Sequence, residues 1–228
     1  MDGTVHSPAE AGLSAAASLE RRPDATIVDC GIGNIKSVQR MFEAVEGQAE
    51  IVSDPSRIAG CRRLVLPGVG AFDAGMNALA EGGWIEALNR VALVERRPVL
   101  GICLGMQLLC RRSEEGVKPG LGWIEADVVR VDLGGRPELK LPHMGWAQTF
   151  AAKPNPLIPG DEGEQRFYYV HKYRALCDRP QDVLATAVYG TEFTSAVHRD
   201  NIFGVQFHPA KSHRFGMALM RRFLDLPC

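Results

Sequence analysis

"PVLGICLGMQLL", residues 98–109, places a short apolar run directly before a turn that contains two glycines. The run 98–103 is expected to form a buried strand. A helix is expected to begin near Gly105, because the chain continues apolar and without a further turn residue. A buried strand that leads at once into a helix is the building unit of a parallel sheet covered by helices. The segment therefore predicts an α/β fold.

Cys103 stands at this turn in the pattern G-x-C-x-G, which is a nucleophile elbow with cysteine in place of serine. Helix amides and the helix dipole favour a thiolate here, and the Leu104 amide is a donor for an oxyanion hole. The alternative is a cysteine that only fills the core. However, glycine weakens strands and helices unless the geometry requires it. We therefore interpret Cys103 as a nucleophile.

Working outward, the first half of the chain alternates strands with helices. The strands are expected in "ATIVD" (25–29), "AEIVS" (49–53) and "RLVLP" (63–67), with helical spacing in "IKSVQRMFEAVE" (35–46). This order predicts a central, mostly parallel sheet with helices on both faces. The second half is strand-rich and suggests added antiparallel strands, closed by a helix in "RFGMALMRRFL" (214–224). We predict one domain over residues 25–228, preceded by a disordered tail over residues 1–24.

Composition narrows the class of protein. The 228 residues are 46% hydrophobic and 23% charged, with a net charge of -1. That balance predicts neither a nucleic-acid nor a membrane partner. The six cysteines lack zinc-site spacing and read as reduced thiols of a cytoplasmic protein. "DCGIGNIKS" (29–37) only half fits a dinucleotide-binding motif, so we predict no cofactor. Because the cysteines lack zinc-site spacing, we also predict no metal.

His208 follows an apolar run, "IFGVQF" (202–207), and precedes a proline. A histidine at the end of a strand is often only structural. Here Cys103 is a candidate partner on another strand of the same sheet, and cysteine with histidine is a minimal pair for acyl transfer from an amide. His143 and His171 are further candidates to line the site.

Five motifs, in this order, resemble those of the triad-type (class I) glutamine amidotransferases, and among them the glutaminase subunits of imidazole glycerol phosphate synthase. They are "LPGVGAFDAGM" (66–76), "GICLGMQLL" (101–109), "PHMGW" (142–146), "YGTEFTSAV" (189–197) and "NIFGVQFHP-KS" (201–212). The resemblance runs from about Ala25 to the C-terminus.

The resemblance implies a catalytic role for Cys103 as nucleophile and His208 as proton carrier. It further implies an oxyanion hole and a glutamine site, formed by Gly68, Val69, Gly70, Leu104, Gln107 and the backbone of Thr194, Ser195 and Ala196. The implied partner is a TIM-barrel cyclase subunit, in a heterodimer that uses the released ammonia to make imidazole glycerol phosphate in histidine biosynthesis.

The chain departs from the family pattern at four positions. Ala210 stands where the family has the triad Glu, Lys172 interrupts "HSY", Ala147 replaces an Asn and Cys30 usually a Tyr. Loss of the carboxylate that orients a catalytic histidine can lower turnover by about 10⁴. We therefore expect impaired turnover, unless another acid such as Glu192 or Asp200 substitutes. Two alternatives are a degenerate binding or regulatory paralogue and an ammonia donor to another synthase, such as a sugar amidotransferase.

Overall fold

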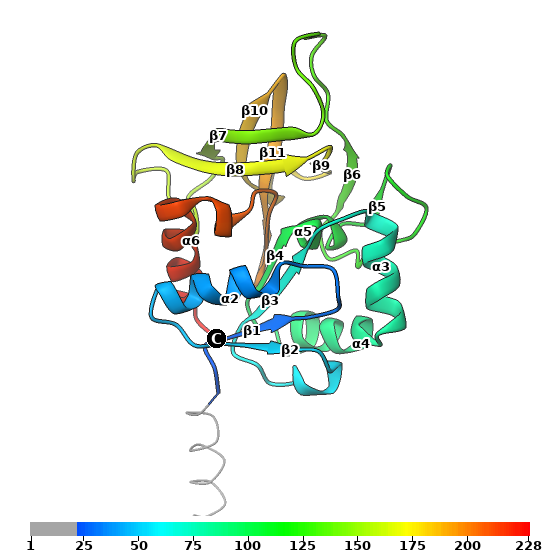
Figure 1. The fold of residues 1–228 in the computed structure, drawn as a ribbon, viewed down its shortest axis with the longest axis vertical. Coiled ribbons are helices and arrows are strands. Elements are labelled where there is room, and N and C mark those ends of the chain that lie inside the picture. The colour runs from blue at the N-terminus through cyan, green and yellow to red at the C-terminus, as the bar shows by residue number, and fades with distance from the viewer. Residues whose placement is uncertain (1–21) are drawn as a thin grey trace, which may run out of the picture.

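The computed structural model describes residues 22–228, so the tail predicted over residues 1–24 lies almost wholly outside the described residues. One sheet runs through the molecule in the strand order β2-β1-β3-β4-β12-β11-β10-β7-β8 (Figure 1). The strands from β2 to β12 are mutually parallel, and β11, β10, β7 and β8 continue the sheet antiparallel. The predicted fold class is confirmed.

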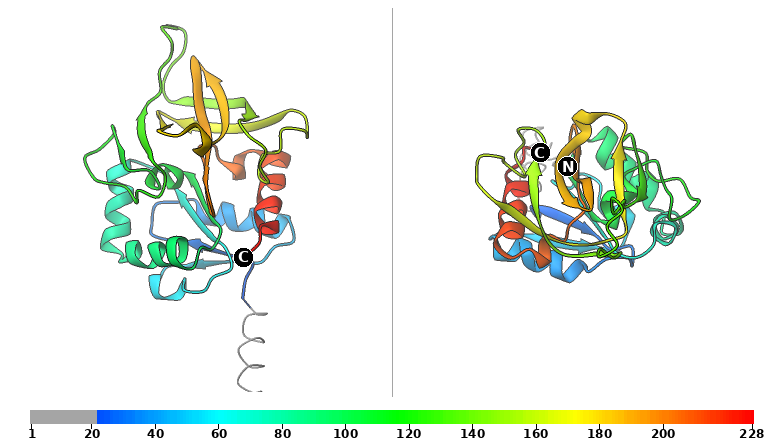
Figure 2. Two further views of the ribbon diagram at one scale, coloured as in Figure 1. Left: turned by 180° about the vertical axis from the view of Figure 1, so that it is seen from behind. Right: turned by 90° about the horizontal axis from the view of Figure 1, so that it is seen from above.

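The parallel half consists of β1 (Ala25–Val28), β2 (Ala49–Val52), β3 (Leu64–Gly68), β4 (Val99–Cys103) and β12 (Ile202–Val205). The antiparallel half consists of β7 (His143–Ala151), β8 (Gln165–His171), β10 (Val183–Tyr189) and β11 (Thr191–Arg199). Three strands branch off this path: β5 (Arg112–Ser113), β6 (Ala126–Arg130) and β9 (Tyr173–Cys177). Figure 2 shows β10 and β11 rising beyond the parallel strands.

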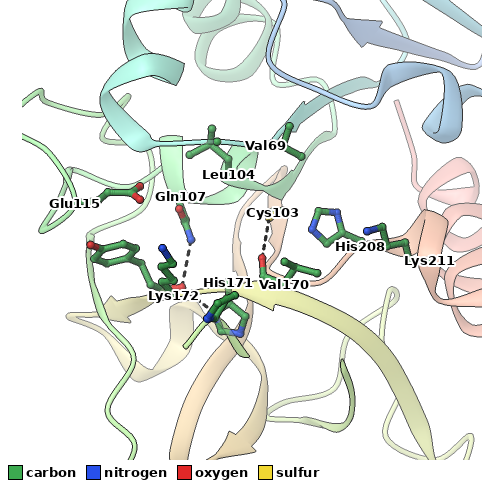
Figure 3. A pocket seen from close by; sticks show the side chains of 13 residues that line it. Val69, Cys103, Leu104, Gln107, Glu115, Val170, His171, Lys172, His208 and Lys211 are labelled. Carbon is green, nitrogen blue, oxygen red and sulfur yellow. Dashed lines mark hydrogen bonds between the residues drawn. The ribbon is translucent and has the colours of Figure 1, made fainter. Parts of the chain in front are cut away.

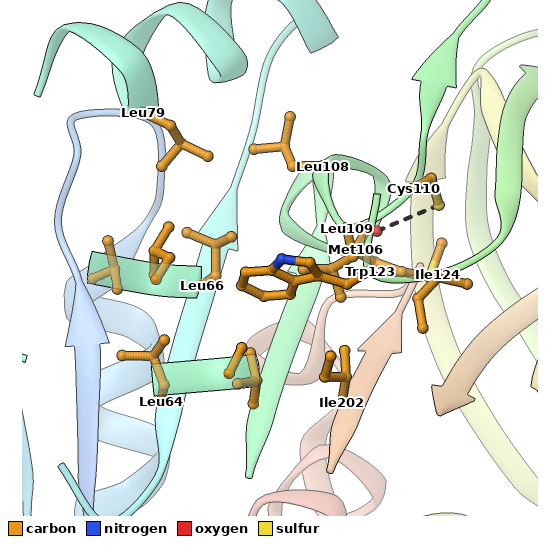
Figure 4. Packing of buried hydrophobic residues seen from close by; sticks show 14 of the residues in the cluster. Leu64, Leu66, Leu79, Met106, Leu108, Leu109, Cys110, Trp123, Ile124 and Ile202 are labelled. Carbon is orange, nitrogen blue, oxygen red and sulfur yellow. Dashed lines mark hydrogen bonds between the residues drawn. The ribbon is translucent and has the colours of Figure 1, made fainter. Parts of the chain in front are cut away.

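Helices cover both faces of the parallel half, because its strands are apolar on both faces. In β3, Leu64 and Leu66 pack on one side and Val65 on the other, as the two-residue period of a strand requires. The first face is covered by α3 (Phe72–Glu81), α4 (Trp84–Asn89, continued by a π-helix over Arg90–Val94) and α5 (Leu104–Leu108). The second face is covered by α2 (Ile35–Ala44) and α6 (His213–Asp225). In Figure 4 the core of the first face gathers Leu66, Leu79, Leu108 and Trp123.

Two features of the antiparallel half differ from the sequence expectation. No strand is predicted from the sequence over the residues of β7. The strand-rich run "RFYYVHKYRAL" (166–176) is divided at Lys172 between β8, which pairs with β7, and β9, which pairs with β6 and β11. No described helix is long and apolar enough to cross a membrane.

Candidate active site

Cys103 and His208 come together because their strands are neighbours. β4 and β12 are parallel, with Val99 opposite Ile202 and Ile102 opposite Val205. The carboxyl ends of parallel strands meet at one edge of a sheet, where ligands bind in open α/β folds. Both residues line a cavity of about 390 Å³ at this edge (Figure 3). The backbone amide of His208 donates to the Tyr168 carbonyl at 2.9 Å, which fixes the chain there.

Cys103 occupies a strained backbone conformation, with φ 57° and ψ -111°. Its Sγ lies 4.0 Å from the carbonyl oxygen of Val170 and accepts from Gln206 Nε2 at 3.9 Å. Burial raises the pKa of the thiol to about 11, although the Leu104 amide, Lys211 and Gln206 act in the opposite direction. The Leu104 amide, at the start of the helix, thus favours the thiolate as expected, but the loss of hydration on burial outweighs it.

His208 has no acidic partner among the residues that the structure describes. Burial, and then the charge of Lys211, lower the pKa of its imidazole to about 4. Across residues 22–228, no hydrogen bond reaches the ring, and residue 210 supplies only a methyl group. Glu115 is the one carboxylate among the described residues that line the cavity, and its Oε2 accepts from the Phe72 amide at 2.9 Å, on the side away from His208 (Figure 3).

Neither candidate substitute for the missing acid faces His208. Glu192 is exposed and accepts from Thr186 Oγ1 at 3.2 Å. Asp200 is exposed, lies 3.7 Å from Arg96, and precedes β12, whereas His208 follows that strand. The two ends of a strand lie at opposite edges of the sheet. Within residues 22–228, the structure therefore leaves His208 without a carboxylate.

Gln107 is held by two bonds from its amide nitrogen, to the Tyr173 carbonyl at 3.3 Å and to Gln206 Oε1 at 3.0 Å. Because both N–H groups are occupied, its oxygen remains to accept a bond from a ligand in the cavity. Gln206 thus connects Gln107 to Cys103, a role that the sequence reasoning missed. The signal available in the sequence is the polar Gln206 inside the otherwise apolar run 202–207, and the structure shows that Gln206 is fully buried.

The glycine-rich turn after β3 supplies fewer donors than expected. The Val69 amide donates to the Ile32 carbonyl at 2.5 Å, so this conformation does not offer it to a ligand. Gly68 packs against the start of α5, where an added Cβ would lie 2.8 Å from the Gly105 nitrogen, and it does not line the Cys103 cavity. Gly70, at φ 106°, and Leu104 do line it, and their amides remain the candidate oxyanion donors.

Thr194, Ser195 and Ala196 are buried in β11 and do not line the cavity. Ser195 Oγ forms a hydrogen bond with Tyr169 Oη at 2.5 Å, and the Ser195 carbonyl accepts a hydrogen bond from the backbone amide of Gln206. The wall expected from these residues comes instead from His171, Lys172 and Tyr173, where the chain passes from β8 to β9. Thr194 pairs with Ala175 of β9, and Ser195 Oγ meets Tyr169 of β8, so these residues are engaged within the fold.

His171 belongs to a buried pair with His143. His171 Nδ1 donates to the Tyr173 carbonyl at 2.9 Å, because a carbonyl can only accept. This fixes the tautomer, so His171 Nε2 accepts from His143 Nδ1 at 3.0 Å. Burial is the largest cause that lowers the pKa of His143 to about 4 and that of His171 to about 3.

The histidine pair predicts a loss of stability in acid. Both pKa values lie below the ordinary 6.5, so the unfolded chain binds more protons as the pH falls from 6.5 toward 4. Each histidine is expected to lower the unfolding free energy by up to about 1.4 kcal/mol per pH unit in this window. Urea unfolding across the window measures the slope. His143→Gln should remove one histidine's share, and an unaltered slope would contradict the assignment.

Alkylation of Cys103 tests the thiol environment. Below a pKa of about 11 the thiolate fraction rises about tenfold per pH unit, and so should the iodoacetamide rate. Gln206→Met keeps the volume but removes the donor to Sγ, and should slow alkylation at a fixed pH about threefold. Mass spectrometry of the Cys103 peptide gives the rate, and the exposed Cys228 serves as internal standard. Equal rates in both proteins would show that Gln206 does not act on the sulfur.

Comparison with known proteins agrees with this geometry. The family profile "Glutamine amidotransferase class-I" matches residues 26–226. The chain is 46% identical over 200 residues to "Imidazole glycerol phosphate synthase subunit HisH 2" of Pseudomonas aeruginosa, covering 88% of this chain and 98% of that protein. It is 47% identical over 199 residues to "Imidazole glycerol phosphate synthase subunit HisH" of Sulfurimonas denitrificans, covering 86% and 95%.

A solved structure shares the fold. "Structure of PurLQS from Thermotoga maritima" superposes with a TM-score of 0.68 at 18% identity, over 90% of this chain and 98% of that one. Because the family profile spans nearly all of the described residues, and relatives above 40% identity match along almost their full length, the chain belongs to the class I glutamine amidotransferase family.

Proposed function

We propose that this chain hydrolyses glutamine to glutamate and ammonia, with Cys103 as nucleophile and His208 as proton carrier. The observation that supports this most directly is the placement of both side chains at the ends of adjacent parallel strands, in one cavity. Gln107, whose free oxygen suits the α-ammonium group of an amino acid, lines the same cavity. No metal or organic cofactor is needed for this chemistry.

In the proposed reaction, the Sγ of Cys103 attacks the side-chain amide carbon while its proton passes to His208. The Leu104 and Gly70 amides stabilise the oxyanion. His208 then protonates the leaving nitrogen, so that ammonia departs and a γ-glutamyl thioester remains. In the second half, His208 takes a proton from water, whose oxygen attacks the thioester carbon. The C–S bond then breaks, glutamate is released, and His208 returns the proton to the Sγ of Cys103. A neutral thiol, with a pKa of about 11, makes the proton transfer to His208 an essential step.

We further propose that the ammonia passes to a TIM-barrel cyclase subunit that makes imidazole glycerol phosphate for histidine biosynthesis, and that the two subunits form a heterodimer. The names of the relatives, which are subunits of that synthase, support this assignment. Met144, Trp146 and Phe150 also expose apolar side chains along β7, as a surface that meets a partner does.

Turnover is proposed to be impaired, because no carboxylate of residues 22–228 compensates the imidazolium that forms on His208 beside Lys211. Ala210 also favours a second candidate, a subunit that binds glutamine or the cyclase without useful turnover. A third candidate is an ammonia donor to another synthase, such as a sugar amidotransferase.

The test measures glutamate release from glutamine by the chain mixed with a cyclase subunit and its ligand, with Cys103→Ala as control. Release that requires Cys103 and is stimulated by the cyclase ligand supports the glutaminase of the histidine pathway. Complex formation without release above the control supports the binding subunit. Release that the cyclase ligand does not stimulate would favour another acceptor pathway.

A further inference from the structure

His208 separates two cavities. Cys103 lies in the first, and a second cavity of about 320 Å³ lies on the side of Ala210. His208, Lys211 and Val69 line both. The second cavity is therefore the space beside the catalytic imidazole that faces away from the nucleophile.

The lining of the second cavity is positive and lacks an acid. Lys211 is its cation, and no carboxylate occurs among the described residues that line it. The His208 ring receives no hydrogen bond from residues 22–228. Asn34 and Ser37 are uncharged polar residues of the lining, whereas Val38, Pro67 and Ile102 form an apolar part of the wall. A cation, an imidazole without a partner and an apolar wall together suit a small organic anion better than a strongly hydrated inorganic one.

We propose that this cavity binds a small monocarboxylate, of the size of acetate or propionate, whose oxygens pair with Lys211 and His208 and whose alkyl group meets the apolar wall. The bound ion would take the place of the carboxylate that Ala210 does not supply. This inference rests on the proposed glutaminase function for its effect on turnover, but not for the binding itself. The volume is ample, since a water molecule takes about 30 Å³ in the liquid.

The consequence is a glutaminase that depends on a carboxylate. A negative charge between Lys211 and His208 acts against the two causes that lower the pKa of the imidazole, burial first and the charge of Lys211 second, and it favours the imidazolium formed during catalysis. In Figure 3 the His208 ring lies next to Lys211, so one ion can serve both groups.

The first measurement is binding, by nuclear magnetic resonance of the imidazole of His208 in the full chain. Acetate and propionate should each raise the pKa of His208 in a saturable way, whereas chloride at equal ionic strength and the neutral isostere acetamide should not. Lys211→Gln should weaken the effect. Ala210→Glu, which carries its own carboxylate, should no longer respond. An unchanged His208 titration in both carboxylates overturns the inference.

The second measurement is the initial rate of glutamine hydrolysis with the cyclase subunit and its ligand. Acetate or propionate should raise the rate of the natural chain by at least about tenfold, a part of the 10⁴ that an orienting carboxylate can supply. If Ala210→Glu hydrolyses glutamine but carboxylates do not stimulate the natural chain, the inference fails and the proposed function stands. If carboxylates shift His208 but neither protein hydrolyses glutamine, the site stands and the proposed function fails.

Discussion

Ala210→Glu is expected to raise the glutaminase kcat of this chain by about 10³ to 10⁴. The new carboxylate would orient the His208 ring and stabilise the imidazolium, which otherwise forms in a buried place beside Lys211. The substitution is sterically simple, because Ala210 is exposed and borders a cavity of about 320 Å³. Residue 210 lies in a single 3₁₀ turn, Pro209–Lys211, whose N-cap residue is His208.

The matched control is Ala210→Gln, which has the same size without the charge. It should recover much less of the rate, because an amide holds the ring but does not stabilise its positive form. Steady-state kinetics with the cyclase subunit and its ligand, at several pH values, measure both variants. If Ala210→Glu turns over no faster than the natural chain while Cys103 remains reactive, the other departures disable the site. Lys172→Ser and Ala147→Asn would then be added.

Strand β4, the elbow and the approach of His208 to Cys103 could be predicted because their signals are local and apolar. A short, mostly apolar run with a turn residue soon after it marks a strand buried on both faces, and two parallel strands bring their carboxyl ends together. The runs 98–103 and 202–207 have this form, with Gly105 and Pro209 shortly after them. The prediction that Cys103 and His208 lie near each other therefore needs no prediction of the loops that connect the strands.

The strand β7 cannot be predicted from apolar runs, because its inward-facing residues include polar ones and its outward-facing residues include apolar ones. His143 and Thr149 point inward and are bonded there, whereas Met144, Trp146 and Phe150 point outward. A pattern that assumes apolar residues inside therefore fails. We propose above that another protein meets these exposed apolar side chains, and the sequence of this chain alone does not contain that information.

The lining of the cavity also differs from the sequence expectation. Thr194, Ser195 and Ala196 lie in a strand whose neighbours are set by long-range pairing, and no local signal shows that residues 171–173 line the cavity in their place. Likewise, the change of partner at Lys172 has no glycine or proline to announce it. Such features depend on which strands pair across more than 30 residues of sequence, for example β6 with β9 over Ala126 and Cys177.

Gly105→Ala is expected to destabilise the chain by more than about 3 kcal/mol, the upper end of the usual range for overpacking. A Cβ at Gly105 would lie 1.8 Å from the Leu66 carbonyl oxygen, which is backbone and cannot rotate away. Relief requires α5 to move off β3. That movement would carry Cys103 with it, because Leu104, the first residue of α5, follows Cys103 directly.

Gly160→Ala is the matched control, since its added Cβ meets only the Ala151 side chain at 3.4 Å, which is an ordinary contact. Urea unfolding should show a change within about 0.5 kcal/mol for the control. If Gly105→Ala were as stable as the control, the close approach of α5 to β3 would be wrong. A stable Gly105→Ala would thus undermine the elbow itself, because the same contact holds Cys103 in its strained conformation at the end of β4. Gly105 is required because α5 packs against the backbone of β3 at this residue. The strained backbone conformation of the turn is that of Cys103, whose φ is 57°.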